Sequence, residues 1–317
     1  MYATRPDVML QADAIAERRD LERAWVRQAI GGARLIPQAA RWVLPPASGT
    51  AKNWRLYRSR FIDPVRINAG VAFWRANRAV LERAQNEFGV PAEIIVGIIG
   101  VETIYGRDMG SFRVIDALCT LSFDFPSAHP RADERRAFFL GELEHLLTMA
   151  YRSGSSAMDF KGSFAGAMGM PQFMPSSWAR HALDFDGDGR IDLFNSSADA
   201  IGSVANYFKA YGWQPGMPTH YAAQFDAAIL DLDALLAPDI LPTFSAASMG
   251  AKGLVLDPVA ARHTGPLALV ELQNGADAAV YVVGTENFYV ITRYNWSSYY
   301  AMAVIDLGQE VAKAMRR

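Results

Sequence analysis

An unbroken apolar segment, Ile94–Val101, is the feature that most constrains the fold of this chain. It reads Ile94-Ile-Val-Gly-Ile-Ile-Gly-Val101 and has no polar side chain to turn toward water. Such a segment has to be covered on every side, either as a strand inside a sheet or as a helix inside a bundle. Pro91 at its start, the flanking Ala92 and Glu93, and its continuation to Tyr105 favour the buried helix.

The chain is long enough to bury such a helix. It has 317 residues, of which 51% are hydrophobic and 20% charged, as in a globular protein of two domains or one large domain with insertions. A formal charge of −2 excludes the overall cationic surface that draws proteins to nucleic acid. Its single cysteine, Cys119, excludes a disulfide within the chain, and the apolar surroundings indicate a buried thiol.

The sequence contains no membrane-spanning or secretory segment. No run of 18 apolar residues occurs, so we expect no transmembrane helix. Charged side chains interrupt the first twenty residues throughout, so the apolar core of a secretory signal is missing there. If the protein works outside the cytoplasm, its export segment is not part of this sequence.

Helical patterns dominate the first two thirds of the chain. We expect helices over Val8–Ile30, Asn68–Phe88, Ala132–Arg152, Pro175–Ala182, Ala198–Tyr211 and Tyr299–Met315. Glycines at Gly31-Gly32, Gly89 and Gly212 end three of them. Prolines and Ser48-Gly49 predict a loop-rich crossing between Pro37 and Trp54.

The pattern changes after Pro215, where loops surround short alternating runs. Strands are expected over Leu267–Leu272, Ala279–Val283 and Phe288–Thr292. The architecture predicted from the residues is therefore a mainly helical body with a small antiparallel β element inserted late.

Glu102 ends the buried segment and is the first candidate for catalysis. The only other carboxylate of that helix, Glu93, lies nine residues earlier and so on the opposite face, where the helix dipole accounts for it. Apolar neighbours would raise the pKa of Glu102 and keep the proton that a general acid needs. A glutamate that merely reaches solvent or an arginine such as Arg107 is the alternative, and composition alone favours it.

A second candidate segment is Gly162-Ser-Phe-Ala-Gly-Ala-Met-Gly-Met-Pro-Gln-Phe-Met-Pro-Ser-Ser177, which is too rich in small residues and proline for a core helix. It predicts a backbone-lined loop in which Ser163 and Gln172 offer hydrogen bonds and Ser176 caps the next helix.

Three stretches resemble the membrane-bound lytic transglycosylase B family: Glu93–Thr103, the loop Gly162–Ser177, and Asp199-Ala-Ile-Gly-Ser-Val-Ala-Asn-Tyr-Phe-Lys209. The similarity extends from about Trp54 to Asn295, and residues 1–50 carry much less of it. The resemblance implies a mainly α fold of the α+β type. It would have a goose-lysozyme-like helical catalytic core with an EF-hand-like loop, an additional helical domain and a small antiparallel β domain.

The resemblance also implies a domain order. We expect a helical region over 1–80 that packs with the C-terminal helix, and the catalytic core over 81–214 with its calcium loop at 184–199. A small β-rich domain over 215–290 and a cleft segment with the C-terminal helix over 291–317 would follow.

By the same resemblance, Glu102 is the catalytic residue. The residues expected to bind substrate are Ser163, Gln172, Tyr57, Tyr207, Tyr294, Asn295, Tyr300, Arg135 and Arg136. Ser163 would hold an N-acetyl group and Gln172 would line the same subsite, while the two arginines would meet peptide or carboxylate groups. Tyrosines suit sugars because the ring packs on CH groups while the hydroxyl hydrogen-bonds. Each aromatic taken singly is better explained by core packing, so these assignments rest mainly on the resemblance.

The activity implied is cleavage of the β-1,4 bond between N-acetylmuramic acid and N-acetylglucosamine in peptidoglycan, without water and with a 1,6-anhydro product. Conventional glycosidases use two carboxylates, whereas this sequence offers one obvious acid and no clear partner. Glu102 would act as acid and then as base, and no catalytic cofactor is expected. The alternatives are a muramidase with the same cleft, distinguished by product mass, and a non-catalytic glycan-binding protein. The second would need a disabled Glu102 site.

The acidic loop Asp184-Phe-Asp-Gly-Asp-Gly-Arg-Ile-Asp192 fits the opening of a calcium loop. Position 12 is Asn195 rather than the usual glutamate, and the ligand that matches the family's longer loop is Asp199. The expected ligands of a structural Ca²⁺ are Asp184, Asp186, Asp188, Arg190 through its carbonyl, and Asp199, with Asp192 acting through water. A solvated acidic turn is the alternative.

The expected partners are peptidoglycan glycan strands, with no nucleic acid. We expect a monomer located in the periplasm. The sequence leaves open whether the mature protein carries an outer-membrane lipid anchor.

Overall fold

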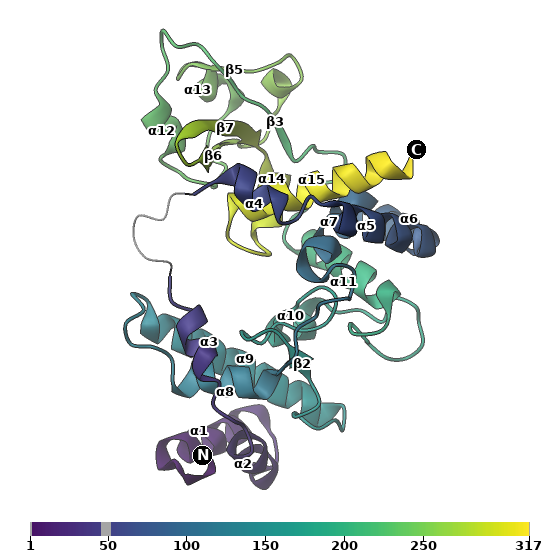
Figure 1. The fold of residues 1–317 in the computed structure, drawn as a ribbon, viewed down its shortest axis with the longest axis vertical. Coiled ribbons are helices and arrows are strands. Elements are labelled where there is room, and N and C mark those ends of the chain that lie inside the picture. Colours follow the sequence, from purple (N-terminus) through teal and green to yellow (C-terminus); the bar gives the residue numbers. More distant parts are fainter. Residues whose placement is uncertain (1, 46–51, 317) are drawn as a thin grey trace. The chain divides into compact units, whose positions relative to one another are not determined.

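The computed structural model describes residues 2–45 and 52–316. The chain divides into two compact units, each assembled from two separate stretches. Unit 1 consists of Met1–Ser48 and Tyr105–Ala200, and unit 2 of Gly49–Ile104 and Ile201–Arg317. Both are mainly helical with short antiparallel strands, which confirms the predicted fold class (Figure 1). The division into four segments that the sequence suggested stays a prediction.

Unit 2 is built around α7 (Ala92–Thr103), the helix formed by the apolar segment. Helices α5 (Pro64–Ala76), α6 (Arg78–Phe88) and α15 (Ser298–Met315) pack against it. Its contact with α15 is made backbone to backbone, because a Cβ atom at Gly97 would lie 2.3 Å from the Val304 carbonyl oxygen. A Cβ atom at Gly308 would lie 2.1 Å from the carbonyl oxygen of Glu93. The glycines of these two helices therefore permit an approach that any larger residue would block.

The β element of unit 2 is a three-stranded sheet in the order β3-β7-β6, with all pairs antiparallel. Its strands are β3 (His220–Ala222), β6 (Ala268–Asn274) and β7 (Asp277–Gly284), and a separate pair joins β4 (Gln224–Phe225) to β5 (Leu254–Val255). The short helices α12 (Leu232–Leu236) and α13 (Ala246–Gly250) and the turn η2 (Ala260–Arg262) complete it. Leu235, Met249, Leu267 and Val283 form its fully buried core. The two strand predictions within 267–283 are confirmed.

The third strand prediction, Phe288–Thr292, is wrong, because this segment forms α14 (Glu286–Thr292). Its aromatic and β-branched residues favour a strand, but Thr285 caps the first turn by accepting the Asn287 N–H. The side chain of Asn287 then donates to the carbonyl oxygens of Gln214 and Met217. These tertiary contacts outweigh a propensity difference that is small and depends on context.

Unit 1 is centred on α8 (Val114–Phe123) and α9 (Ala132–Arg152), which pack against each other. Around them lie η1 (Tyr2–Thr4), α1 (Pro6–Arg19), α2 (Arg23–Gly31), α3 (Pro37–Trp42) and α10 (Pro175–His181). Strands β1 (Phe112–Arg113) and β2 (Lys161–Gly162) form a short antiparallel pair. Cys119 on α8 is fully buried, as predicted.

Two helices predicted as continuous are broken. The pattern over Val8–Ile30 gives α1 and α2, separated at Asp20, whose φ of 53° is left-handed. The chain then returns with the Leu21 N–H bonded to the Ala16 carbonyl oxygen. The pattern over Asn68–Phe88 begins earlier, at Pro64, and breaks at Asn77 between α5 and α6. Apolar spacing continues across both breaks and so does not reveal them.

The expected loop-rich crossing is partly helical, because its first residues form α3, which begins at Pro37. Helix α4 (Trp54–Ser59) begins where the crossing ends. The middle of the crossing, which includes Pro46 and Ser48-Gly49, lies outside the described residues. Helix α11 (Ser197–Ala210) is confirmed within one residue at each end. In the part of the chain that the structure describes, no helix combines the length and apolarity needed to cross a membrane.

Candidate functional site

Glu102 lies in the last turn of α7, where the helix leaves the core of unit 2. The helix stops at Ile104, whose φ of 50° is left-handed and turns the chain away at once. The Glu102 side chain is half-buried, and the hydroxyl of Tyr300 on α15 donates a hydrogen bond to its Oε1 atom. The helix pair that the glycines bring together therefore places an acid beside a phenol.

Burial controls the protonation of Glu102. It raises the pKa of this carboxyl from the usual 4.5 to about 7, while the Tyr300 hydrogen bond, a smaller effect, lowers it. At neutral pH a substantial fraction of Glu102 therefore keeps its proton. A carboxylic acid in this state can protonate a leaving oxygen.

Tyrosines surround the acid within unit 2. The ring of Tyr294 stacks on that of Tyr300 at 6.4 Å and contacts the ring of Tyr207 at 4.9 Å. Burial first, and then the charge of Glu102, raises the pKa of both Tyr294 and Tyr300. These hydroxyls stay neutral and act as hydrogen-bond donors at any physiological pH.

The predicted cleft tyrosines differ in how much surface they offer. Tyr207 and Tyr300 are only 5% and 3% exposed, and the Tyr207 hydroxyl donates to the Arg293 carbonyl oxygen at 2.7 Å. These two rings form the wall that buries Glu102 rather than an open face for a sugar. Tyr57 and Tyr294 are half-buried, and Asn295 is exposed in the turn before α15.

Ser163 and Gln172 lie in the glycine-rich loop of unit 1. The Ser163 Oγ atom accepts the N–H groups of Ala165 and Ala167, so its own hydrogen stays available to a ligand. The Gln172 amide donates both hydrogens, to the carbonyl oxygens of Met109 and Gly169, which leaves its Oε1 atom as an acceptor. Gln172 also has a φ of 50°, a left-handed conformation that costs a non-glycine residue about 1 kcal/mol.

The loop is held by contacts that the sequence did not reveal. The carboxylate of Glu142, 4% exposed on α9, accepts the N–H of Ser176 at 2.8 Å and its hydroxyl at 2.7 Å. The expected cap by Ser176 is therefore wrong. The helix α10 begins with Met174 as its N-cap and Pro175 in its first turn, and Glu142 satisfies its N-terminal N–H instead. The only sequence feature that could have indicated this role is that Glu142 lies among the apolar positions of α9.

Arg135 and Arg136, which were predicted to act as a pair, have different surroundings. The guanidinium of Arg135 lies over the rings of Phe138 and Phe139, and burial lowers its pKa. It lines a cavity of about 340 Å³ together with Phe164, the neighbour of Ser163. Arg136 instead pairs with Asp133 at 3.3 Å. Of the predicted pair, only Arg135 is brought to the glycine-rich loop.

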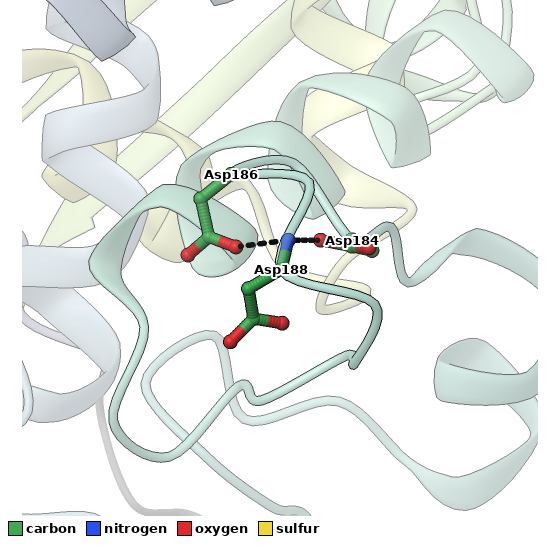
Figure 2. A group of neighbouring side chains, drawn as sticks. All are labelled: Asp184, Asp186 and Asp188. Atoms are coloured by element: carbon green, nitrogen blue, oxygen red, sulfur yellow. Dashed lines mark hydrogen bonds between the residues drawn. The ribbon is translucent and has the colours of Figure 1, made fainter.

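The acidic loop brings three carboxylates together. One oxygen from each of Asp184, Asp186 and Asp188 lies within 4.8 Å of the others. Figure 2 shows the three side chains in the loop, with the Asp188 N–H donating to Asp184 and Asp186. Oxygens that share a calcium ion at 2.3–2.6 Å are at most about 5 Å apart, so this spacing fits the ion. Gly187 and Gly189, with φ of 79° and 90°, supply the left-handed turns that side chains would hinder.

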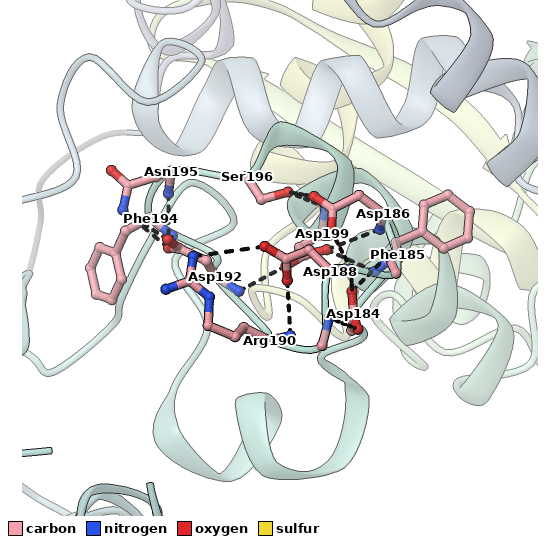
Figure 3. Close-up of polar contacts among 12 residues, drawn as sticks. Asp184, Phe185, Asp186, Asp188, Arg190, Asp192, Phe194, Asn195, Ser196 and Asp199 are labelled. Carbon is pink, nitrogen blue, oxygen red and sulfur yellow. Dashed lines mark hydrogen bonds and ion pairs between the residues drawn. The ribbon is translucent and has the colours of Figure 1, made fainter. Parts of the chain in front are cut away.

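Asp199 has a different place in this loop. It is 1% exposed, and its two oxygens accept the N–H groups of Phe185 and Asp192, both at 2.7 Å (Figure 3). Asp199 therefore ties the loop to the first turn of α11. Arg190 donates its N–H to Asp188, and Asp192 accepts bonds from Asn195. Of the predicted carboxylate ligands, the structure therefore brings Asp184, Asp186 and Asp188 together and does not bring Asp199 into that group.

One acid with a raised pKa at the end of a buried helix suits an enzyme that cleaves glycans by general acid catalysis. The family model described as the transglycosylase SLT domain matches residues 5–309, and the chain belongs to this family. The match includes the N-terminal residues, in which the resemblance was weak. The membrane-bound lytic murein transglycosylase B of Escherichia coli (strain K12) is 41% identical over 322 residues. The alignment covers 99% of this chain and 84% of that protein.

Solved structures agree with this membership. The Escherichia coli lytic transglycosylase SLT35 in complex with bulgecin A is 40% identical, with a TM-score of 0.87 over 99% of this chain and 95% of that one. A complex of SLT35 with calcium gives a TM-score of 0.86. SltB1 from Pseudomonas aeruginosa is 39% identical, with a TM-score of 0.88 over 99% of this chain and all of that one. The chain is thus a peptidoglycan lytic transglycosylase with the lysozyme-like fold.

Proposed function

We propose that the chain cleaves the β-1,4 bond between N-acetylmuramic acid and N-acetylglucosamine without water, leaving a 1,6-anhydromuramoyl end. The observation that carries this proposal is the carboxyl of Glu102, whose pKa burial raises to about 7. No other carboxylate in the described part of unit 2 affects the pKa of Glu102 or of its tyrosine neighbours. A single acid suits a reaction in which the substrate supplies its own nucleophile.

Protonated Glu102 gives its proton to the glycosidic oxygen, and the bond between that oxygen and the muramoyl C1 atom breaks. The N-acetyl group of the muramoyl unit stabilises the cationic C1 atom. The C6 hydroxyl then attacks C1, and the Glu102 carboxylate takes the hydroxyl proton. Glu102 therefore gives up one proton and takes one back. The C6 hydroxyl reacts within the same molecule and so has a high effective concentration.

The hydrogen-bond roles of the loop residues support their assignment to the N-acetyl group. Ser163 has one hydrogen to donate to the acetyl carbonyl, and Gln172 has one oxygen to accept the amide N–H. Tyr57, Tyr294 and Asn295 are exposed enough to touch sugar, and Tyr207 and Tyr300 support them from behind. Arg135, with Arg136 beside it on α9, would meet carboxylate or peptide groups.

We also propose a structural calcium ion, held by Asp184, Asp186, Asp188, the Arg190 carbonyl and Asp199, with Asp192 acting through water. The spacing of the three exposed carboxylates supports it, and so does the calcium complex of SLT35. Bound there, the ion would neutralise the three carboxylates and fix the loop before α11. Catalysis would need no cofactor.

The cellular setting follows from the substrate. A chain that cuts murein glycan works in the periplasm, where we place it as a monomer acting on peptidoglycan strands. The four-segment domain order, 1–80, 81–214, 215–290 and 291–317, belongs to the same proposal.

Digestion of sacculi in water enriched with oxygen-18 tests the chemistry. Internal cyclisation leaves the muramoyl products unlabelled and lighter than reducing ends by one water. A muramidase, by contrast, places the label on the new reducing end, and parallel digestion with one provides the control. Labelled reducing-end muramic acid as the main product would overturn the proposal.

A further inference from the structure

Glu142 on α9 is a buried acid that the chemistry above does not use. It is 4% exposed, and its two carboxylate oxygens accept the Ser176 N–H at 2.8 Å and the Ser176 hydroxyl at 2.7 Å. Among the residues that the structure describes, no cationic side chain lies within ion-pair distance of this carboxylate. Burial of a carboxylate is costly unless hydrogen bonds compensate for it. The two bonds to Ser176 are therefore what stabilises the acid in this place.

A second buried acid of α9 holds a different part of unit 1. Glu144 is 8% exposed and pairs with Arg18 at 2.6 Å and with Arg19 at 2.9 Å, both on α1. Side chains two residues apart on a helix point to different sides of it. In unit 1, α9 accordingly contacts both α1 and α10 (Figure 1). Glu144 attaches α9 to α1, whereas Glu142 attaches it to the end of the glycine-rich loop.

The glycine-rich loop is closed on itself just before α10. The Phe173 N–H donates to the Met168 carbonyl oxygen at 3.0 Å, and the Met168 N–H donates to that of Phe173 at 2.9 Å. Met168 is also bridged to Gly162, the residue before Ser163. Phe173 is 2% exposed and so anchors this closure in the core of unit 1. The end of the loop and the backbone at Ser163 are therefore tied together.

Gln172 lies inside this closure in a strained conformation. Its φ of 50° is left-handed, and a non-glycine residue persists in that conformation only where its surroundings hold it. On its N-terminal side, its own N–H donates to the Gly169 carbonyl oxygen at 3.1 Å. On its C-terminal side, the chain is held at Phe173 and then at Ser176 by Glu142. The contact with Glu142 is thus one of those that maintain the strain.

We propose that Glu142 is a positioning residue for the N-acetyl subsite. By holding Ser176 it fixes the end of the loop, and it thereby keeps Gln172 in the conformation that offers the Gln172 Oε1 atom to the amide N–H of the sugar. The inference rests on the proposed role of Ser163 and Gln172. Hydrogen bonds from behind hold a binding side chain in its productive geometry. Loss of this contact should therefore weaken binding of the N-acetyl group in particular.

Titration with an N-acetylated oligomer and with its de-N-acetylated form tests the proposal. The probes are chitotetraose and the corresponding amine, and a Glu102→Gln background prevents cleavage. We expect this background protein to bind chitotetraose at least about tenfold more tightly, because the amine leaves groups of the subsite unpaired. Addition of Glu142→Gln, which offers one acceptor oxygen in place of two, should make the two affinities nearly equal.

The matched control is Glu144→Gln, the same chemical change on the same helix. It should lower the free energy of unfolding but keep the affinity ratio of the background protein, as any merely structural loss in α9 would. Ser176→Ala removes the other partner of the contact and should lower the ratio by itself. Because both residues act through one contact, Glu142→Gln and Ser176→Ala together should lower the ratio no further than the larger single effect.

Three outcomes would overturn the positioning role: an unchanged ratio in Glu142→Gln, an equal fall in Glu144→Gln, or additive effects of Glu142→Gln and Ser176→Ala. Equal binding of the two oligomers by the background protein would remove the N-acetyl subsite and this inference with it. Digestion in oxygen-18 water decides the proposed chemistry separately. If its products carry the label, that chemistry fails, and the titration still decides whether Glu142 supports the N-acetyl subsite.

Discussion

Tyr300 on α15 donates a hydrogen bond to Glu102 on α7, across 198 positions of sequence. The contact exists because Gly97 and Gly308 let the two helices meet at their backbones. It holds the carboxyl at one place in its half-buried site, where burial raises the pKa to about 7. The packing of α7 against α15 therefore determines the pKa of Glu102.

Replacement of the acid tests its role most directly. Glu102→Gln keeps the shape and a hydrogen-bond acceptor for Tyr300 but removes the transferable proton. Clearing of sacculi should fall by at least about two to four orders of magnitude, the usual contribution of general acid–base catalysis. The matched control is Glu93→Gln, on the same helix but the opposite face, which should retain activity. Substantial turnover by Glu102→Gln would move the catalytic role elsewhere.

The raised pKa of Glu102 predicts the pH dependence of the reaction. The enzyme needs the protonated acid in its free state, and burial holds that pKa at about 7. The value of kcat/KM should therefore fall tenfold per pH unit above about pH 7. A rate profile of soluble glycan cleavage measures this. A fall already complete by pH 5.5 would show that Glu102 has an ordinary acidity.

The same shift predicts a pH-dependent stability. Because the folded pKa of Glu102 lies above the usual 4.5, its proton favours the fold, and this stability is lost as pH rises from about 4.5 to about 7. Glu102→Gln does not titrate. Its stability relative to wild type should therefore increase over that window by at most about 3 kcal/mol. Denaturant unfolding of both proteins at pH 4.5 and pH 8 checks the sign, and a difference that does not change with pH contradicts it.

The variant Tyr300→Phe removes the hydrogen bond between Tyr300 and Glu102 and keeps the ring. That bond lowers the pKa of Glu102, so its loss should move the alkaline limb of the rate profile to higher pH. The control Tyr207→Phe removes a hydroxyl that bonds the Arg293 carbonyl oxygen instead. It should cost about 1 kcal/mol of stability and leave the limb in place. Identical limbs in wild type and Tyr300→Phe would exclude a direct effect on the acid.

Calcium should stabilise the fold through the acidic loop. If the loop binds the ion only when folded, a concentration of 100 times Kd adds about 2.7 kcal/mol to the free energy of unfolding. Asp188→Ala should abolish this gain. Asp159→Ala, an exposed acid of the same unit outside the loop, should keep it. Identical melting curves in chelator and in excess calcium would leave the loop as a plain acidic turn.

The sequence by itself determined the parts of this protein that depend on local chemistry. The apolar run before Glu102 can only be a buried element, and its length and Pro91 made it the helix α7. Residues 132–152 form α9 with the predicted bounds, and Gly89 ends its helix with a left-handed φ of 72°. Carboxylate spacing in the acidic loop likewise predicted that Asp184, Asp186 and Asp188 converge. In each case residues close in sequence decide the outcome.

Tertiary structure decided the rest, because contacts between distant residues outweigh local propensity. Segment 286–292 became a helix through the cap at Thr285 and the anchoring of Asn287, against its strand-like composition. Glu142 on α9 became the group that holds the glycine-rich loop at Ser176, a partner that the sequence did not reveal. The acidity of Glu102 depends on how deeply α15 and its tyrosines bury it. That depth is set by long-range packing, which no local stretch of sequence encodes.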